Sequence, residues 1–226
     1  LLTMAEAQRR AIERSHQLNA KDFAVAASRD MAVAAGQLPD PVLKVGIDNL
    51  PVSGRDRFSL GNDFMTMRRV GVMQEITRSD KRRLRSDRFE LEAQKTLAEK
   101  TVAAAAIQRD TALAWLDRYY AEAMATVIAE QGEQAKLEIQ SAEGTYRAGR
   151  GNQADIFAAR SALAAFDDRA SETQRRVRNA NTMLARWSGD VTGLTLADKP
   201  ATNTIRLDPE TLDTDLVHHP EIAIRS

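Results

Sequence analysis

The sequence contains no cysteine, which excludes disulfide bonds, thiolate metal sites and cysteine nucleophiles. Aromatic residues make up only 5% of the 226 residues, and this scarcity favours helices packed closely through small side chains over a thick globular core. Lysine plus arginine equals aspartate plus glutamate, at 32 each, so no overall field attracts nucleic acid. No apolar run approaches the ~20 residues that a membrane-spanning helix needs.

Proline is missing from residues 52–199, although six prolines lie outside that stretch. Three glycines, Gly144, Gly149 and Gly151, cluster within it. This pattern predicts two long helices joined by a tight turn. The first is expected over about residues 79–146, or ~100 Å at 1.5 Å per residue. The second is expected to end at Ser188, just before Gly189.

Apolar and small residues recur every seven positions in both predicted helices. In the first helix the series is Leu84, Leu91, Ala98, Ala105, Ala112 and Tyr119. In the second helix there are two series, namely Ile156, Leu163, Ala170, Val177 and Leu184, and Ala159, Phe166, Thr173, Ala180 and Trp187. Two interleaved series are typical of the a and d positions of a coiled coil. The heptads therefore predict coiled-coil packing without identifying the partner helix.

Shorter elements are expected before the long helices. Thr3 and Glu6 match a capping box at the start of a helical region, which continues with a break near residues 15–16. The region ends at Pro39 and Pro41. In the next segment Leu43, Val45 and Ile47 alternate with Lys44, Gly46 and Asp48, and this period of two predicts a strand with one apolar face.

A second strand is expected within residues 64–76, after a turn-rich segment. Its alternation is less regular, because Arg68 and Arg69 fall on both faces. Beyond Gly189 the chain is rich in threonine and proline, and a short helix is expected to begin near residues 208–210. Residues 219–223 weakly resemble residues 15–19, as they would if a second copy of the unit began there.

The predicted fold class is mainly α. It consists of a long antiparallel coiled-coil helical hairpin, a shorter N-terminal helix and a two-stranded β-hairpin insertion. The expected segments are N-terminal helices over 1–38, the β-hairpin over 39–77, the helical hairpin over 78–189 with its tip near 146–152, and a linker with the start of a second repeat over 190–226.

Three segments, in this order, resemble TolC-like outer-membrane efflux proteins of the heavy-metal branch. They are residues 35–42 (AGQLPDPV), residues 70–76 (VGVMQEI), and residues 146–149 (YRAG) followed by 155–157 (DIF). The resemblance covers nearly the whole chain and corresponds to the first of two repeats. It implies that three full-length protomers form a twelve-stranded barrel in the outer membrane and a helical tunnel in the periplasm.

The resemblance also implies a function. The protein would be the channel component of a tripartite efflux system, exporting metal cations passively across the periplasm and outer membrane. Its partners would be a periplasmic adaptor (membrane fusion) protein, an inner-membrane efflux pump and outer-membrane lipid. We expect no enzymatic activity and no cofactor, because no nucleophile–base set, paired carboxylates or phosphate-binding loop is present.

Candidate site residues follow from the same resemblance. Tyr146, Arg147, Gly149, Asp155 and Ile156 would form the tip that docks the adaptor, and Asp155 would also form a constriction in the channel. The alternative is a plain interhelical turn, with glycines for its backbone and Asn152 or Asp155 as a helix cap. In the first strand, Leu43, Val45 and Ile47 would face lipid.

The remaining candidates have simpler structural interpretations. Residues 78–88 carry six basic and two acidic side chains and are expected to be a solvated helix start. His16, His218 and His219 lack metal-site spacing, and Met65, Met67 and Met73 are expected to be packing residues, so no metal site is predicted. A soluble coiled-coil scaffold or adaptor hairpin is the alternative function. The predicted strands distinguish the two, because a scaffold has no use for a pair of barrel-type strands.

Overall fold

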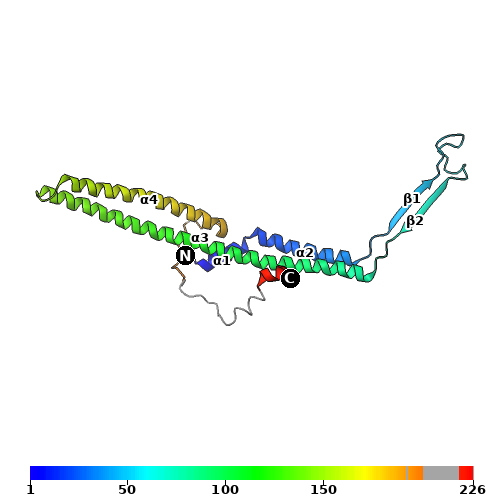
Figure 1. Cartoon of the computed structure of the whole chain (residues 1–226), viewed down its shortest axis with the longest axis horizontal. Helices are drawn as coiled ribbons and strands as arrows, with labels where there is room; N and C mark the ends of the chain where they lie inside the picture. The colour runs from blue at the N-terminus through cyan, green and yellow to red at the C-terminus, as the bar shows by residue number, and fades with distance from the viewer. Residues whose placement is uncertain (192, 201–218, 226) are drawn as a thin grey trace. The chain divides into compact units, whose positions relative to one another are not determined.

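The computed structural model describes residues 1–191, 193–200 and 219–225, and it is mainly helical (Figure 1). In chain order the elements are α1 (Met4–Glu13), α2 (His16–Gly36), β1 (Val42–Asp48), β2 (Met67–Met73), α3 (Ser79–Arg147), α4 (Gln153–Ser188) and α6 (Pro220–Arg225). The predicted fold class, a helical hairpin with a two-stranded insertion, is confirmed. The short helix expected near residues 208–210 lies outside the described residues.

The chain divides into two compact units. One consists of residues 1–21 together with the described part of 98–226, and the other consists of residues 22–97. Helices α2 and α3 contribute to both units. The first unit contains the hydrophobic core and the turn between α3 and α4, whereas the second contains the strand pair.

The main core of the first unit lies where α1, α3, α4 and residues 190–197 meet. Its buried members are Leu2, Ala7, Ala114, Trp115, Leu184 and Val191. Trp115 is completely buried, donates its indole N–H to the carbonyl oxygen of Leu2 at 3.0 Å, and stacks on Tyr119 at 5.5 Å between ring centroids. Leu2 in turn forms a parallel bridge with Leu196, which ties the start of the chain to the segment after α4.

A buried arginine lies beside this core. Only 7% of the Arg118 side chain is exposed. Its Nε donates to the Glu122 carboxylate at 2.7 Å, and its Nη2 donates to the Leu194 carbonyl at 2.6 Å. A carboxylate and a carbonyl thus offset part of the cost of burying the guanidinium, whose Nη1 has no hydrogen-bond partner among the described residues.

Burial along α4 follows the predicted heptads, whereas burial along α3 does not. Nine of the ten predicted α4 positions are at least partly buried, with Ala170 the exception. In α3, Leu84 and Leu91 are 65% and 63% exposed. Apart from Trp115, the apolar residues of α3 that are buried instead lie at multiples of seven residues from one another, namely Ala93, Ile107, Ala114, Ala121, Ile128 and Ala135.

The predicted register of α3 is therefore wrong at its leucines, whereas Ala98, Ala112 and Tyr119 of the predicted series are partly buried. The larger leucines stand out in the sequence, yet a close approach between two helices selects alanine at the contact. At each position along α3, the other helices of this chain pack against only one of its sides. The leucines on its other side remain exposed.

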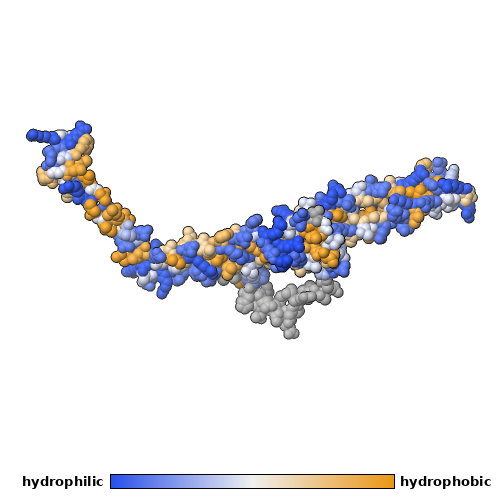
Figure 2. Space-filling view, turned by 180° about the vertical axis from the view of Figure 1, so that it is seen from behind, coloured by the Kyte–Doolittle hydropathy of each residue, from blue (hydrophilic) through white to orange (hydrophobic). Residues whose placement is uncertain are grey.

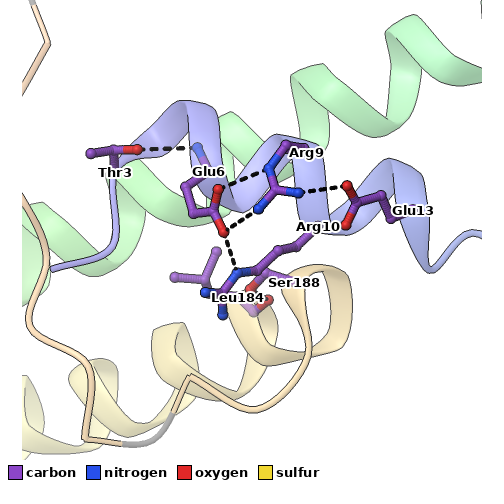
Figure 3. A network of polar contacts seen from close by, with 7 residues as sticks. All are labelled: Thr3, Glu6, Arg9, Arg10, Glu13, Leu184 and Ser188. Carbon is purple, nitrogen blue, oxygen red and sulfur yellow. Dashed lines mark hydrogen bonds and ion pairs between the residues drawn. The ribbon is translucent and has the colours of Figure 1, made fainter.

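The predicted cap at the start of α1 is half confirmed. The Thr3 hydroxyl accepts from the backbone N–H of Glu6 at 3.1 Å. The Glu6 carboxylate does not return the contact. It accepts hydrogen bonds from Arg9 and Arg10 instead, while Arg9 also reaches Glu13 (Figure 3). Chiefly the hydrogen bond from Arg10, and then that from Arg9, lowers the pKa of Glu6 below its ordinary value of 4.5.

This arginine cluster predicts an acid-dependent contribution to stability. The pKa of Glu6 is lower in the folded chain than in the unfolded chain. Ionised Glu6 therefore stabilises the fold fully at pH values above the ordinary pKa of 4.5, and this stabilisation is lost as the pH falls through the lowered pKa. We expect Glu6→Gln to be less stable than the parent at pH 7. The difference should shrink between about pH 5 and about pH 3, as measured by urea unfolding. A difference that is constant over this range would contradict the assignment.

Candidate docking turn and strand pair

The turn between α3 and α4 is built from a glycine and a reciprocal cap. Gly149 has a φ of 68°, a left-handed conformation that favours glycine, and its N–H donates to the Tyr146 carbonyl at 3.0 Å. The next helix begins with a capping box. The Asn152 side chain accepts from the N–H of Asp155 at 2.9 Å, and the Asp155 carboxylate accepts from the N–H of Asn152 at 3.2 Å.

An ion-pair cluster joins the two helices next to the turn. The Glu143 carboxylate of α3 accepts from Arg160 of α4 at 2.9 Å and pairs with Arg147 at 3.5 Å. The Glu143–Arg147 spacing of four residues is readable from the sequence. The Arg160 contact depends on which faces of the helices meet, and sequence reasoning missed it.

The predicted docking residues have different environments at this turn. Tyr146, Arg147 and Asp155 are exposed, whereas Ile156 is partly buried. Phe157, which the prediction left out, is 59% exposed. Asn152 is the N-cap of α4, as the alternative interpretation allowed, and Asp155 completes the capping box from the third helical position with its side chain exposed to solvent. Capping and a role at a channel mouth are compatible for this carboxylate.

The register of the strand pair assigns its two faces. Val45 lies opposite Val70, and Gly46 lies opposite Arg69. Directly opposite residues of an antiparallel pair share one face. One face thus carries Leu43, Val45, Ile47, Val72, Val70 and Arg68, and we call it the aliphatic face. The other, the polar face, carries Val42, Lys44, Gly46, Asp48, Met73, Gly71, Arg69 and Met67.

The irregular arginines of the second strand are explained by this register. Arg69 lies on the polar face, where its Nη2 is 2.5 Å from Asp48 Oδ2, an ion pair without an aligned hydrogen bond. Arg68 lies on the aliphatic face, opposite Ile47. Met67 and Met73 share the polar face, whereas Met65 precedes β2. Uncovered aliphatic side chains gather over the strand pair (Figure 2).

Within residues 1–191, 193–200 and 219–225, no group of three His, Cys, Asp or Glu side chains could hold a metal ion. His218 is outside these residues. No helix among the same residues is long and apolar enough to cross a membrane.

Three solved structures share this arrangement. A membrane protein from Pseudomonas aeruginosa matches 98% of this chain with a TM-score of 0.73 and 11% identity. The outer-membrane channel OprN matches 98% with a TM-score of 0.73 and 16% identity. The CmeC outer-membrane channel of Campylobacter jejuni matches 83% with a TM-score of 0.63 and 12% identity. The chain has the fold of one half of an outer-membrane channel.

The three matches cover 54%, 51% and 41% of the matched chains, so this chain spans about half their length. Neither a protein-family model nor a curated protein matches it in sequence. With identities of 11–16%, the similarity establishes the fold, and the activity of the whole protein is a matter for proposal.

Proposed function

We propose that this chain is half of an outer-membrane channel subunit, the exit duct of a tripartite efflux system. The strands would lie in the outer membrane and the long helices in the periplasm. Transport through the duct would be passive, with the energy supplied by an inner-membrane pump. The similarity of fold to outer-membrane channels supports this proposal.

The strand pair is the observation that carries it. A soluble coiled-coil scaffold, the alternative function, would gain nothing from an uncovered aliphatic sheet face between two helices. Val45, Val70 and Val72 are 72%, 75% and 74% exposed. In a closed barrel these side chains would meet lipid, while Lys44 and Asp48 would face the water-filled lumen.

The turn between α3 and α4 would dock the periplasmic adaptor. Tyr146 and Phe157 are 48% and 59% exposed there, and aromatic side chains are typical anchors of protein interfaces. Arg147, Gly149 and Ile156 complete the proposed docking residues. Three protomers would bring copies of Asp155 together at the tunnel mouth, where a ring of carboxylates favours cations. The proposed substrates, metal cations, follow from the sequence resemblance.

Expression of the full-length gene product in a deletion strain tests the proposal. We expect recovery in the outer-membrane fraction, extraction by detergent as a trimer, and restored resistance to metal salts. A soluble, non-trimeric protein that leaves resistance unchanged would instead support the scaffold. A trimeric outer-membrane protein that restores resistance only to organic compounds would keep the channel and reject the metal substrates.

Variants of the turn should separate docking from folding. Gly149→Pro removes the N–H that donates to Tyr146 and replaces a φ of 68° by one near −65°. Asp155→Arg removes half of the capping box, which costs about 1 kcal/mol. We expect both variants to lose efflux resistance while the helical circular dichroism signal stays nearly unchanged. Asp155→Asn, which keeps an acceptor for the cap, is the control for stability, and unchanged resistance in the first two variants would contradict the docking assignment.

A further inference from the structure

The aliphatic face of the strand pair contains one cationic side chain, Arg68, at one of its ends. Three cross-strand pairs build this face, namely Leu43 with Val72, Val45 with Val70, and Ile47 with Arg68. The third pair lies at the end next to the loop of residues 49–66. Arg68 is therefore the one charged position among the six, and it lies at the edge of the face, not at its centre.

Arg68 also differs from the other cations of the strand pair. Arg69, its neighbour in the sequence, lies on the polar face and is paired with Asp48. Lys44 is on that polar face too. Arg68 is exposed and forms no ion pair with any residue that the structure describes. Its cross-strand neighbour is Ile47, and the next residue along its own face is Val70.

A cation on a lipid-facing strand is more stable at the surface of the bilayer than at its middle. A charge on the lipid-facing side of a barrel is costly at the middle of the bilayer and nearly free at its edge. The long apolar stem of arginine can lie along aliphatic neighbours while its head reaches the interface. The planar guanidinium donates two parallel hydrogen bonds to phosphate, which makes it a strong ligand for that group.

The adjacent loop carries exposed aromatic and cationic side chains, beside the carboxylates of Asp56 and Asp63. The Arg57 guanidinium lies 4.8 Å from the centre of the Phe58 ring, and Phe64 is 93% exposed. Aromatic side chains gather where a bilayer meets water, and cations attract anionic headgroups there. The loop thus indicates that the Arg68 end of the aliphatic face lies at headgroup level.

We propose that Arg68 binds the phosphate of an anionic lipid headgroup, in the leaflet next to the loop of residues 49–66, and so fixes the depth of the strand pair. This inference rests on the proposed function, since it requires the strands to be in a membrane. Charge complementarity selects an anionic lipid as the occupant. A neighbouring strand would pair with the edges of β1 and β2 and would leave the aliphatic face open to lipid.

The test compares lipid binding by two charge-matched variants of the full-length protein. Arg68→Gln removes the cation on the aliphatic face, and Lys44→Gln removes one on the polar face without breaking the Asp48 ion pair. Purified trimers are titrated with phosphatidylglycerol and, separately, with phosphatidylcholine, and bound lipid is counted by native mass spectrometry. We expect the parent to prefer phosphatidylglycerol, Arg68→Gln to lose that preference at least fivefold, Arg68→Lys to retain part of it, and Lys44→Gln to match the parent.

Four results would overturn the inference, and the last of them would overturn the proposed function as well. Equal losses in Arg68→Gln and Lys44→Gln would show a general charge effect. A parent trimer without any preference for phosphatidylglycerol would reject the site and leave the channel intact. Complete displacement of the lipid by inorganic phosphate would assign Arg68 to a free anion. Failure to recover the parent from membranes at all would overturn the proposed function together with this inference.

Discussion

Trp115→Ala should lower the free energy of unfolding by about 3–5 kcal/mol, the usual cost of emptying a large buried aromatic site. The indole is completely buried, and its N–H donates to the Leu2 carbonyl, which also accepts the backbone N–H of Ala197. Its removal would leave a cavity where α1, α3 and α4 meet, and it would loosen the link between Leu2 and Leu196. Urea unfolding followed by helical circular dichroism measures the change.

Two further variants make this result specific. Leu113→Ala removes a side chain that is 55% exposed in the same helix, and it should cost less than about 1 kcal/mol. Trp115→Phe keeps most of the volume but loses the N–H donor, and an intermediate cost of about 1–3 kcal/mol is expected. If Trp115→Ala cost no more than Leu113→Ala, the core would not lie at this junction.

Leu184→Asp is the second substitution with a large expected effect. Leu184 is completely buried in the same core, so the change removes an apolar side chain and places a carboxylate where water does not reach. We expect a loss of at least about 4 kcal/mol, from the combined costs of lost burial and charge desolvation. Thermal unfolding of the chain at neutral pH is the measurement.

The adjacent residue provides the control. Met183 is 51% exposed on the same turn of α4, so Met183→Asp has the same effect on net charge and a similar effect on helix propensity. It should cost less than about 1 kcal/mol. Equal losses in the two variants would mean that α4 packs through a different face, and the heptad register of α4 would be rejected.

Helix boundaries were predictable because proline and glycine mark them. The first long helix was expected over residues 79–146 and is found at Ser79–Arg147. The second ends at Ser188 as expected, because Gly189 follows with a φ of 85° and donates its N–H to Ala185. These signals are local, so a single sequence contains all the information that they need.

Contacts between distant residues were not predictable in the same way. The hydrogen bond from Trp115 to Leu2 joins residues 113 positions apart, and no spacing pattern in the sequence predicts it. Leu84 and Leu91 of the predicted α3 series are exposed, because the side of α3 that meets another helix depends on residues distant in the sequence. On the strands, the alternating pattern located the aliphatic face of β1, whereas the faces of Arg68 and Arg69 became clear only from the pairing with β1.

At the candidate site, too, local features were predictable from the sequence and contacts between distant residues were not. The capping role of Asn152 and Asp155 was among the sequence-based alternatives, because short polar side chains before a helix have a known local geometry. The Arg160–Glu143 bridge was missed, because it requires α3 and α4 to be placed against each other. Adaptor docking and a constriction at Asp155 depend on partners outside this chain and stay predictions.

Membrane insertion of the strand pair is the central claim, and cysteine labelling tests it most directly. This chain has no cysteine, so single cysteines can be introduced at Leu43, Lys44, Val45, Gly46 and Ile47 of the full-length protein once any cysteine outside this chain has been replaced by serine. In intact outer membranes, a water-soluble maleimide should label positions 44 and 46 through the lumen. Positions 43 and 45 should be labelled only after detergent extraction, whereas position 47, which lies opposite Arg68 at headgroup level, should be labelled in part. Equal labelling of all five positions in the membrane would contradict the account.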